Sequence, residues 1–136
     1  MVSKEVTIDS VRLSLMSNEW VTILKGKDTE QYLPIYMGPS QANIVKRELR
    51  GARFYEPRVY EQFLARTDIS GSSLESVIVD GPENGAFHAK LLLTEDGNSF
   101  EMDCPVAGAL ALGFRRNASI LVDETTFHEA GITLSE

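Results

Sequence analysis

Apolar and polar residues alternate along the first part of the chain in a pattern typical of half-buried strands. The segment 5–16 alternates loosely, which predicts one strand with a bulge, and the segment 19–27 is its predicted partner. Asn18 stands between them, where a turn is expected. The segment 30–38 is also rich in β-forming residues, but Pro34 lacks a backbone N–H and so confines this strand to an edge or a bulge.

Two segments with helical spacing follow a break at 38–40. In 39–51 the apolar residues recur three and four positions apart, and Gly51 stands where a helix commonly ends. The segment 59–70 has the same spacing after Pro57. Two helices are therefore expected in the middle of the chain.

The segment 73–103 returns to strand-like runs. Three such runs are separated by Asn84-Gly85 and by Asp96-Gly97, which are dipeptides that tolerate positive φ in tight hairpins. The pattern predicts an antiparallel meander of three strands.

The segment 105–115 has apolar or small residues on nearly every side of a helical wheel, which predicts a helix that is buried almost all round. Pro105 suits its first turn, where a missing N–H costs nothing. A short strand at 119–123 and a last helix beginning near Asp123 complete the pattern. We expect one α+β domain over 1–136, with a mixed or antiparallel sheet of six to seven strands.

The composition fits this expectation. A chain of 136 residues is long enough for one compact core. It contains no apolar run near the roughly 18 residues that a membrane helix needs, and its first ten residues do not resemble an export signal, so a cytoplasmic location is expected. Cys104 is the one cysteine, and with His88 and His128 it offers too few ligands for a zinc site. We expect Cys104 to be a small buried residue rather than a nucleophile.

The charge is unevenly distributed. Residues 1–66 hold ten Lys and Arg against eight Asp and Glu, whereas residues 67–136 hold three against twelve, and the whole chain carries -7. Such a net charge argues against indiscriminate binding to nucleic acid. The first half nevertheless contains a basic cluster that could meet phosphates, although a solvated helix face is the better interpretation. The cluster consists of Lys46, Arg47, Arg50, Arg53 and Arg58.

Four motifs in order resemble those of the bifunctional nuclease domain family of bacteria and plants. They are "LPIYMGPSQA", "FYEPRVYEQFL", "VIVDGPENGAFHAKLLL" and "DCPVAGALALGFRRNASILVDETTFHEAGI". The resemblance spans about residues 10 to 132. It implies weak hydrolysis of DNA and RNA, aided by Mg²⁺ or Mn²⁺.

The carboxylates that match family positions are Glu61, Asp80 and Asp103, and the resemblance implies that they surround a divalent cation while Lys46, Arg47, Arg50 or Arg53 holds phosphate. Each carboxylate also has a structural interpretation. Asp103 could cap the following helix, Asp80 could form a turn, and Glu61 could be a solvated helix residue. His88 and His128 show no partner spacing, and the strand pattern predicts that His88 faces outward.

The chain also departs from the family pattern. Pro105, Ala107 and Gly108 stand where the family has an arginine, a serine and an aspartate, and Tyr60 and Gln41 replace a histidine and a glutamate. Two hypotheses follow. The chain is a weak nuclease, or it is a non-catalytic homodimeric domain that binds a partner or a small ligand.

A homodimer is expected under either hypothesis. The segment 30–37 offers an apolar and aromatic edge that bears Tyr32 and Tyr36, and exposed strands of that kind are usually covered. The resemblance also implies self-association.

Overall fold

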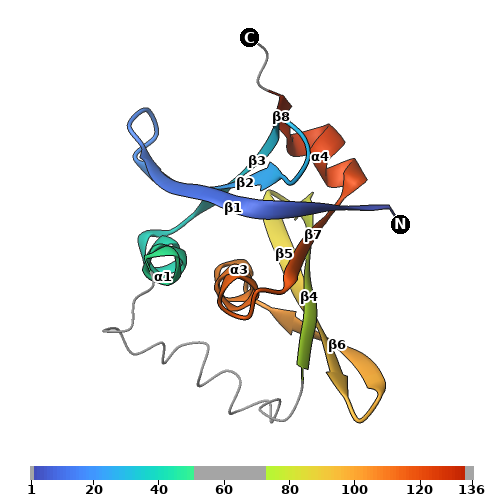
Figure 1. Cartoon of the computed structure of the whole chain (residues 1–136). Coiled ribbons are helices and arrows are strands. Elements are labelled where there is room, and N and C mark those ends of the chain that lie inside the picture. The colour runs from blue at the N-terminus through green and yellow to red at the C-terminus, as the bar shows by residue number, and fades with distance from the viewer. Residues whose placement is uncertain (1, 51–72, 134–136) are drawn as a thin grey trace.

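The described strands form one mixed eight-stranded sheet in the order β6-β5-β4-β7-β1-β2-β3-β8. The structure is a computed structural model that describes residues 2–50 and 73–133 (Figure 1). Its strands are β1 (Ser3–Ser14), β2 (Glu19–Gly26), β3 (Gln31–Met37), β4 (Ser73–Glu83), β5 (Ala86–Glu95), β6 (Asn98–Cys104), β7 (Ser119–Asp123) and β8 (Ile132–Thr133).

Tight turns join most neighbouring strands. The strands pair antiparallel throughout, except that β4 and β7 run parallel. Asn18, Asn84 and Asp96 have φ between 51° and 57°, so each expected turn residue adopts the left-handed conformation that a tight hairpin needs. The expected bulge in the first strand is confirmed as a register shift between Ile8 and Ser10. The predicted meander is confirmed as β4, β5 and β6.

Three helices complete the described fold: α1 (Pro39–Leu49), α3 (Val106–Arg115) and α4 (Glu124–Ala130). Helices α1 and α3 lie side by side (Figure 1), and Arg115 Nε approaches Glu48 Oε1 to 3.9 Å across their contact. The last helix begins where the sequence predicts, because the Asp123 side chain accepts a hydrogen bond of 3.2 Å from the Thr125 N–H.

Helix α3 is the centre of the core, as its apolar pattern predicts. Seven consecutive residues, 107–113, are buried, and Leu110 and Leu112 are 0% and 1% exposed. Gly113 allows the close approach of the sheet, since a Cβ there would lie 3.0 Å from Val77 Cγ2 and 3.1 Å from Ile120 Cγ1. The α+β class and the buried helix are therefore confirmed.

The sheet has more strands than the six to seven expected from the sequence. The additional strand, β8, has two residues and pairs with Gln31 and Tyr32 of β3, which is too short a contact for a periodic pattern to reveal. Pro34 lies on the part of β3 beyond this contact, so its position next to an open edge agrees with its missing N–H. The helix predicted at 59–70 lies outside the described residues.

Candidate functional site

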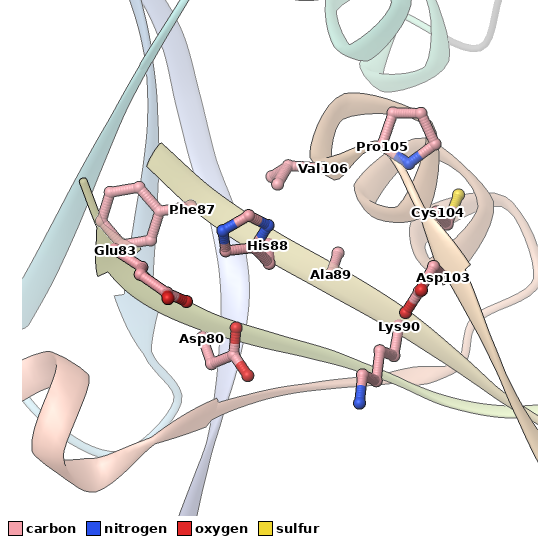
Figure 2. A pocket seen from close by; sticks show the side chains of 10 residues that line it. All are labelled: Asp80, Glu83, Phe87, His88, Ala89, Lys90, Asp103, Cys104, Pro105 and Val106. Carbon is pink, nitrogen blue, oxygen red and sulfur yellow. The ribbon is translucent and has the colours of Figure 1, made fainter. Parts of the chain in front are cut away.

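A cleft of about 600 Å³ opens where β4, β5 and β6 meet the start of α3. Two of the three predicted carboxylates, Asp80 and Asp103, line it although 23 positions separate them in the sequence. The third, Glu61, lies outside the described residues. Figure 2 shows the lining side chains, which are Asp80, Glu83, Phe87, His88, Ala89, Lys90, Asp103, Cys104, Pro105 and Val106.

Asp80 and His88 are brought together by the register of β4 and β5. Glu83 pairs with Ala86 next to the turn, but an irregularity between Asp80 and Glu83 shifts the register by one residue, so that Asp80 pairs with His88 rather than with Ala89. Directly opposed residues of an antiparallel pair project from the same face with Cβ atoms about 5 Å apart. The irregularity therefore places a carboxylate beside an imidazole.

Lys90 and Asp103 form a second opposed pair, between β5 and β6. Lys90 is two residues after His88, so both side chains project from the same face of β5. His88, Lys90 and Asp103 are exposed and Asp80 is half-buried, so solvent reaches all four. Two acid–base pairs thus lie next to each other on one face of the meander.

The opposite face of these strands is packed against α3. Val79 pairs with Ala89, and Ala89 pairs with Cys104, and all three are less than a tenth exposed. Burial raises the pKa of the Cys104 thiol to about 11, which keeps the sulfur protonated and unreactive at neutral pH. The interpretation of Cys104 as a buried packing residue is confirmed, and the polar face of the cleft rests on a well-packed core.

The structural interpretations of the two carboxylates were wrong. Asp103 does not cap α3, because β6 continues through Cys104, Pro105 occupies the N-cap position, and no side chain there accepts a capping hydrogen bond. Asp80 does not form the turn, because it lies within β4 and the turn falls at Asn84. Both carboxylates belong to strands and are directed by strand register.

His88 faces outward, as expected, but the spacing of residues in the sequence indicates no partner for it. The sequence does carry a signal for the Lys90–Asp103 pair. A regular two-residue turn at 96–97 joins β5 and β6, and counting outward from this turn pairs Lys90 with Asp103. The Asp80–His88 pair carries no such signal, since a regular hairpin would have paired Asp80 with Ala89. The irregularity follows Asp80 at Gly81, which has a φ of +112°.

The residues of the cleft do not fit a divalent cation held by the protein alone. Within 2–50 and 73–133, no three acidic, histidine or cysteine side chains are grouped as metal ligands. Asp80 and Asp103 stand on the two strands that flank β5, about 10 Å apart at strand spacing, and they oppose different residues of β5. The expected Mg²⁺ or Mn²⁺ therefore gains no support from the described part of the cleft.

Two of the positions that depart from the family pattern lie in the core, Gln41 is exposed on α1, and Tyr60 lies outside the described residues. Pro105 lines the cleft, whereas Ala107 and Gly108 are buried in α3 and do not line it. A Cβ at Gly108 would lie 3.7 Å from Cys104 Sγ, which is an ordinary packing contact. The two small residues thus favour close packing of α3.

The described residues of the basic cluster do not line the cleft. Lys46, Arg47 and Arg50 are at the C-terminal end of α1, which packs against α3 and β2, and none of them lines the cleft. The Lys46 ammonium lies 4.5 Å from the centroid of the Trp20 ring, so it makes a cation–π contact within the fold. Arg53 and Arg58 lie outside the described residues. Among the residues that line the cleft, Lys90 is the one permanent cation.

Comparison with known proteins agrees with the resemblance seen in the motifs. The model of the bifunctional nuclease domain matches residues 22–135, which is most of the chain. The chain belongs to the bifunctional nuclease domain family. The match covers every residue of the candidate cleft and the whole of α3.

Two uncharacterized proteins of Mycobacterium tuberculosis, from strains CDC 1551 / Oshkosh and ATCC 25618 / H37Rv, are similar to this bifunctional nuclease domain protein. Each is 24% identical over 132 residues, which is 97% of this chain and 79% of the relative. None of the helices in the described parts of the chain has the length and hydrophobicity of a membrane span.

Proposed function

We propose that this protein is a weak phosphodiester hydrolase that acts on DNA or RNA, and that its site is the cleft formed by β4, β5, β6 and the start of α3. The observation that supports this proposal is the side-by-side placement of the Asp80–His88 and Lys90–Asp103 pairs. Membership of the bifunctional nuclease domain family supports the reaction class.

The pairs supply two of the functions that hydrolysis needs. His88 takes a proton from the attacking water as the new P–O bond forms, and the Asp80 carboxylate stands opposite His88 on β4. Lys90 stabilises the negative charge that develops on the phosphate oxygens while the ester bond breaks, and the leaving oxygen takes a proton from solvent. Asp103 stands opposite Lys90 on β6, at the side of the cleft that this strand forms.

We infer from the same geometry that the proposed activity is weak. The lining of the cleft has one lysine and one histidine but three carboxylates, those of Asp80, Glu83 and Asp103. The cleft therefore repels the polyanionic substrate. None of the described basic residues of α1 lines the cleft to offset that repulsion. The polar groups of the cleft are also open to solvent, which weakens each electrostatic interaction with the substrate.

A paired cleavage assay tests the proposal. Labelled single-stranded and duplex substrates are incubated with the wild type and with Asp80→Asn, Asp103→Asn and Glu101→Gln, each with EDTA, with Mg²⁺ or with Mn²⁺. Glu101→Gln is the matched control, because Glu101 is exposed on the same face of β6, two residues from Asp103, and does not line the cleft. We expect slow cleavage that falls in Asp80→Asn and Asp103→Asn and is kept in Glu101→Gln.

A non-catalytic role is the second candidate, and one observation favours it. The described residues offer no three grouped ligands for a metal, which many phosphodiester hydrolases require. In that case the cleft binds a partner or a small ligand without reaction. Equal trace cleavage by all four proteins would indicate a contaminant and would support this second role over the first.

A further inference from the structure

Glu83 is the third carboxylate that lines the cleft, and no basic residue stands opposite it. It pairs with Ala86 across β4 and β5, whereas each of the other two lining carboxylates opposes a histidine or a lysine. Glu83 is exposed, and within residues 2–50 and 73–133 its carboxylate makes no hydrogen bond or ion pair. The two acid–base pairs therefore leave one carboxylate of the cleft open to a ligand.

Glu83 lies on the same face of the meander as the two pairs. Ala86 and His88 are two residues apart on β5, so they and the residues opposite them project from one face. At about 3.4 Å per residue, Glu83 lies roughly 7 Å from the Asp80–His88 pair towards the hairpin turn, and Lys90 lies a similar distance away on the other side. The polar face of the cleft is thus a row with Glu83 at one end and Lys90 at the other.

A carboxylate at this end of the row repels a phosphate but suits a hydrogen-bond donor. In the proposed reaction the phosphate lies between His88 and Lys90, so Glu83 stands beyond it. The sugar and base of a nucleotide extend away from its phosphate, towards that end of the row. Because an ionised carboxylate accepts hydrogen bonds and donates none, Glu83 discriminates between bases by the N–H groups that they present.

The lining of the cleft also includes apolar surface that a base can cover. Phe87 and Val106 are half-buried and Pro105 is exposed, and all three line the cleft (Figure 2). Unpaired bases stack on aromatic and apolar side chains, from which a phosphate gains nothing. The cleft volume of about 600 Å³ lies within the usual range for sites that hold small molecules. The cleft thus has room and surface for a base beside the phosphate.

We propose that Glu83 selects an unpaired guanine in the nucleotide next to the hydrolysed bond, an inference that rests on the proposed function. On its Watson–Crick edge guanine presents N1–H and N2–H₂ side by side, so the two oxygens of one carboxylate accept both hydrogen bonds at once. Such bonds to an ionised acceptor are stronger than those between neutral groups. Adenine and cytosine offer a single amino group there, and uracil and thymine offer one N–H between two carbonyl oxygens that the carboxylate repels.

The same hydrogen bonds restrict the substrate to single strands. In a duplex, the N1–H and N2–H₂ groups of guanine are bonded to cytosine, and the major groove presents the N7 and O6 acceptors of guanine, which a carboxylate repels. Glu83 therefore reaches its two donors only where the guanine is unpaired. A third carboxylate weakens the binding of phosphate, but at this position it distinguishes one base from the others.

Two short single-stranded probes that differ at one base test the role of Glu83. One has a single guanine within a thymidine tract, and the other has inosine at that position, which lacks the N2 amino group. Fluorescence anisotropy is recorded directly after mixing, before slow cleavage proceeds. We expect the wild type to bind the guanine probe roughly fivefold more tightly than the inosine probe, because hydrogen bonds to a charged group are worth more than neutral ones.

Two variants, each checked for folding by circular dichroism, assign this preference to one residue. In Glu83→Gln the ratio of the two affinities should approach one, while the affinity for the inosine probe rises because the carboxylate no longer repels phosphate. Glu101→Gln is the matched control and should keep the wild-type ratio, because Glu101 is exposed on the same face but does not line the cleft. Equal affinities for the two probes in the wild type, or a guanine preference that persists in Glu83→Gln, overturns the proposal.

The cleavage rates of the same probes separate this inference from the proposed hydrolysis. A wild type that binds guanine preferentially through Glu83 but cleaves neither probe supports recognition by Glu83 and contradicts the hydrolase. Cleavage of both probes by the wild type at equal rates and with equal affinities supports the hydrolase and removes the role of Glu83.

Discussion

Asp80 lies directly opposite His88 because the strand β4 gains an irregularity at Gly81 and Pro82, just before the hairpin turn. Without it, the register set by Glu83 and Ala86 would pair Asp80 with Ala89 and direct the carboxylate to the core face. One local feature of the backbone thus decides whether the cleft contains an acid–imidazole pair.

The first prediction concerns that feature. Gly81 has a φ of +112°, and a Cβ there would lie 2.9 Å from the Ala86 carbonyl oxygen. We expect Gly81→Ala to lower the free energy of unfolding by about 1–3 kcal/mol, measured by urea denaturation. Gly85→Ala is the control, because Gly85 also has a positive φ, of +79°, but its Cβ would meet nothing within 4 Å. An equal loss in the two variants would show that the close contact at Gly81 does not matter.

The residues of the cleft show how far the sequence predicts a site. The family motifs identify Asp80 and Asp103 as candidates, and both line the cleft. The motifs do not identify the partners of these carboxylates. Pairing Asp103 with Lys90 needs only a count from a regular turn, but pairing Asp80 with His88 needs a register shift that propensity and periodicity do not reveal.

The second prediction compares two glycines of α3. A Cβ at Gly113 would press on Val77 and Ile120 at 3.0–3.1 Å, whereas a Cβ at Gly108 would make an ordinary contact of 3.7 Å with Cys104. We expect Gly113→Ala to reduce the free energy of unfolding by about 1–3 kcal/mol through overpacking. Gly108→Ala should be neutral or stabilising by up to about 1 kcal/mol, because alanine favours a helix interior over glycine. Urea denaturation of both variants decides the matter, and the reverse order would refute the packing described for α3.

The burial of helix α3 is the feature that the sequence predicts best. Its apolar residues surround the helical wheel, so its burial follows from the pattern alone, and no tertiary information is needed. The strand β8 is the opposite case. Ile132 and Thr133 form a strand only because β3 lies beside them, so no local pattern could have predicted it.

The third prediction concerns Cys104. Burial raises its pKa to about 11, so at about pH 8 iodoacetamide should alkylate the folded protein at least roughly tenfold more slowly than the protein unfolded in urea, where the thiol has a pKa of about 8.5. The folded pKa is the higher one, so the thiol adds stability that is fully present below about pH 8.5 and is lost as the pH rises through about 11. Mass spectrometry of the alkylated chain measures the rates. Equal rates for folded and unfolded protein would show that the thiol is not protected by the core.

The ratio of the cleavage rates of His88→Gln and Glu101→Gln tests the central claim most directly. Both changes replace an exposed titratable side chain by a neutral amide in the same meander, but only His88 lines the cleft and opposes Asp80. Because loss of a general base typically costs about 10²–10⁴-fold in rate, we predict that His88→Gln cleaves single-stranded nucleic acid at least about a hundredfold more slowly than Glu101→Gln, which keeps the wild-type rate. Equal rates in the two folded variants would contradict hydrolysis at this cleft.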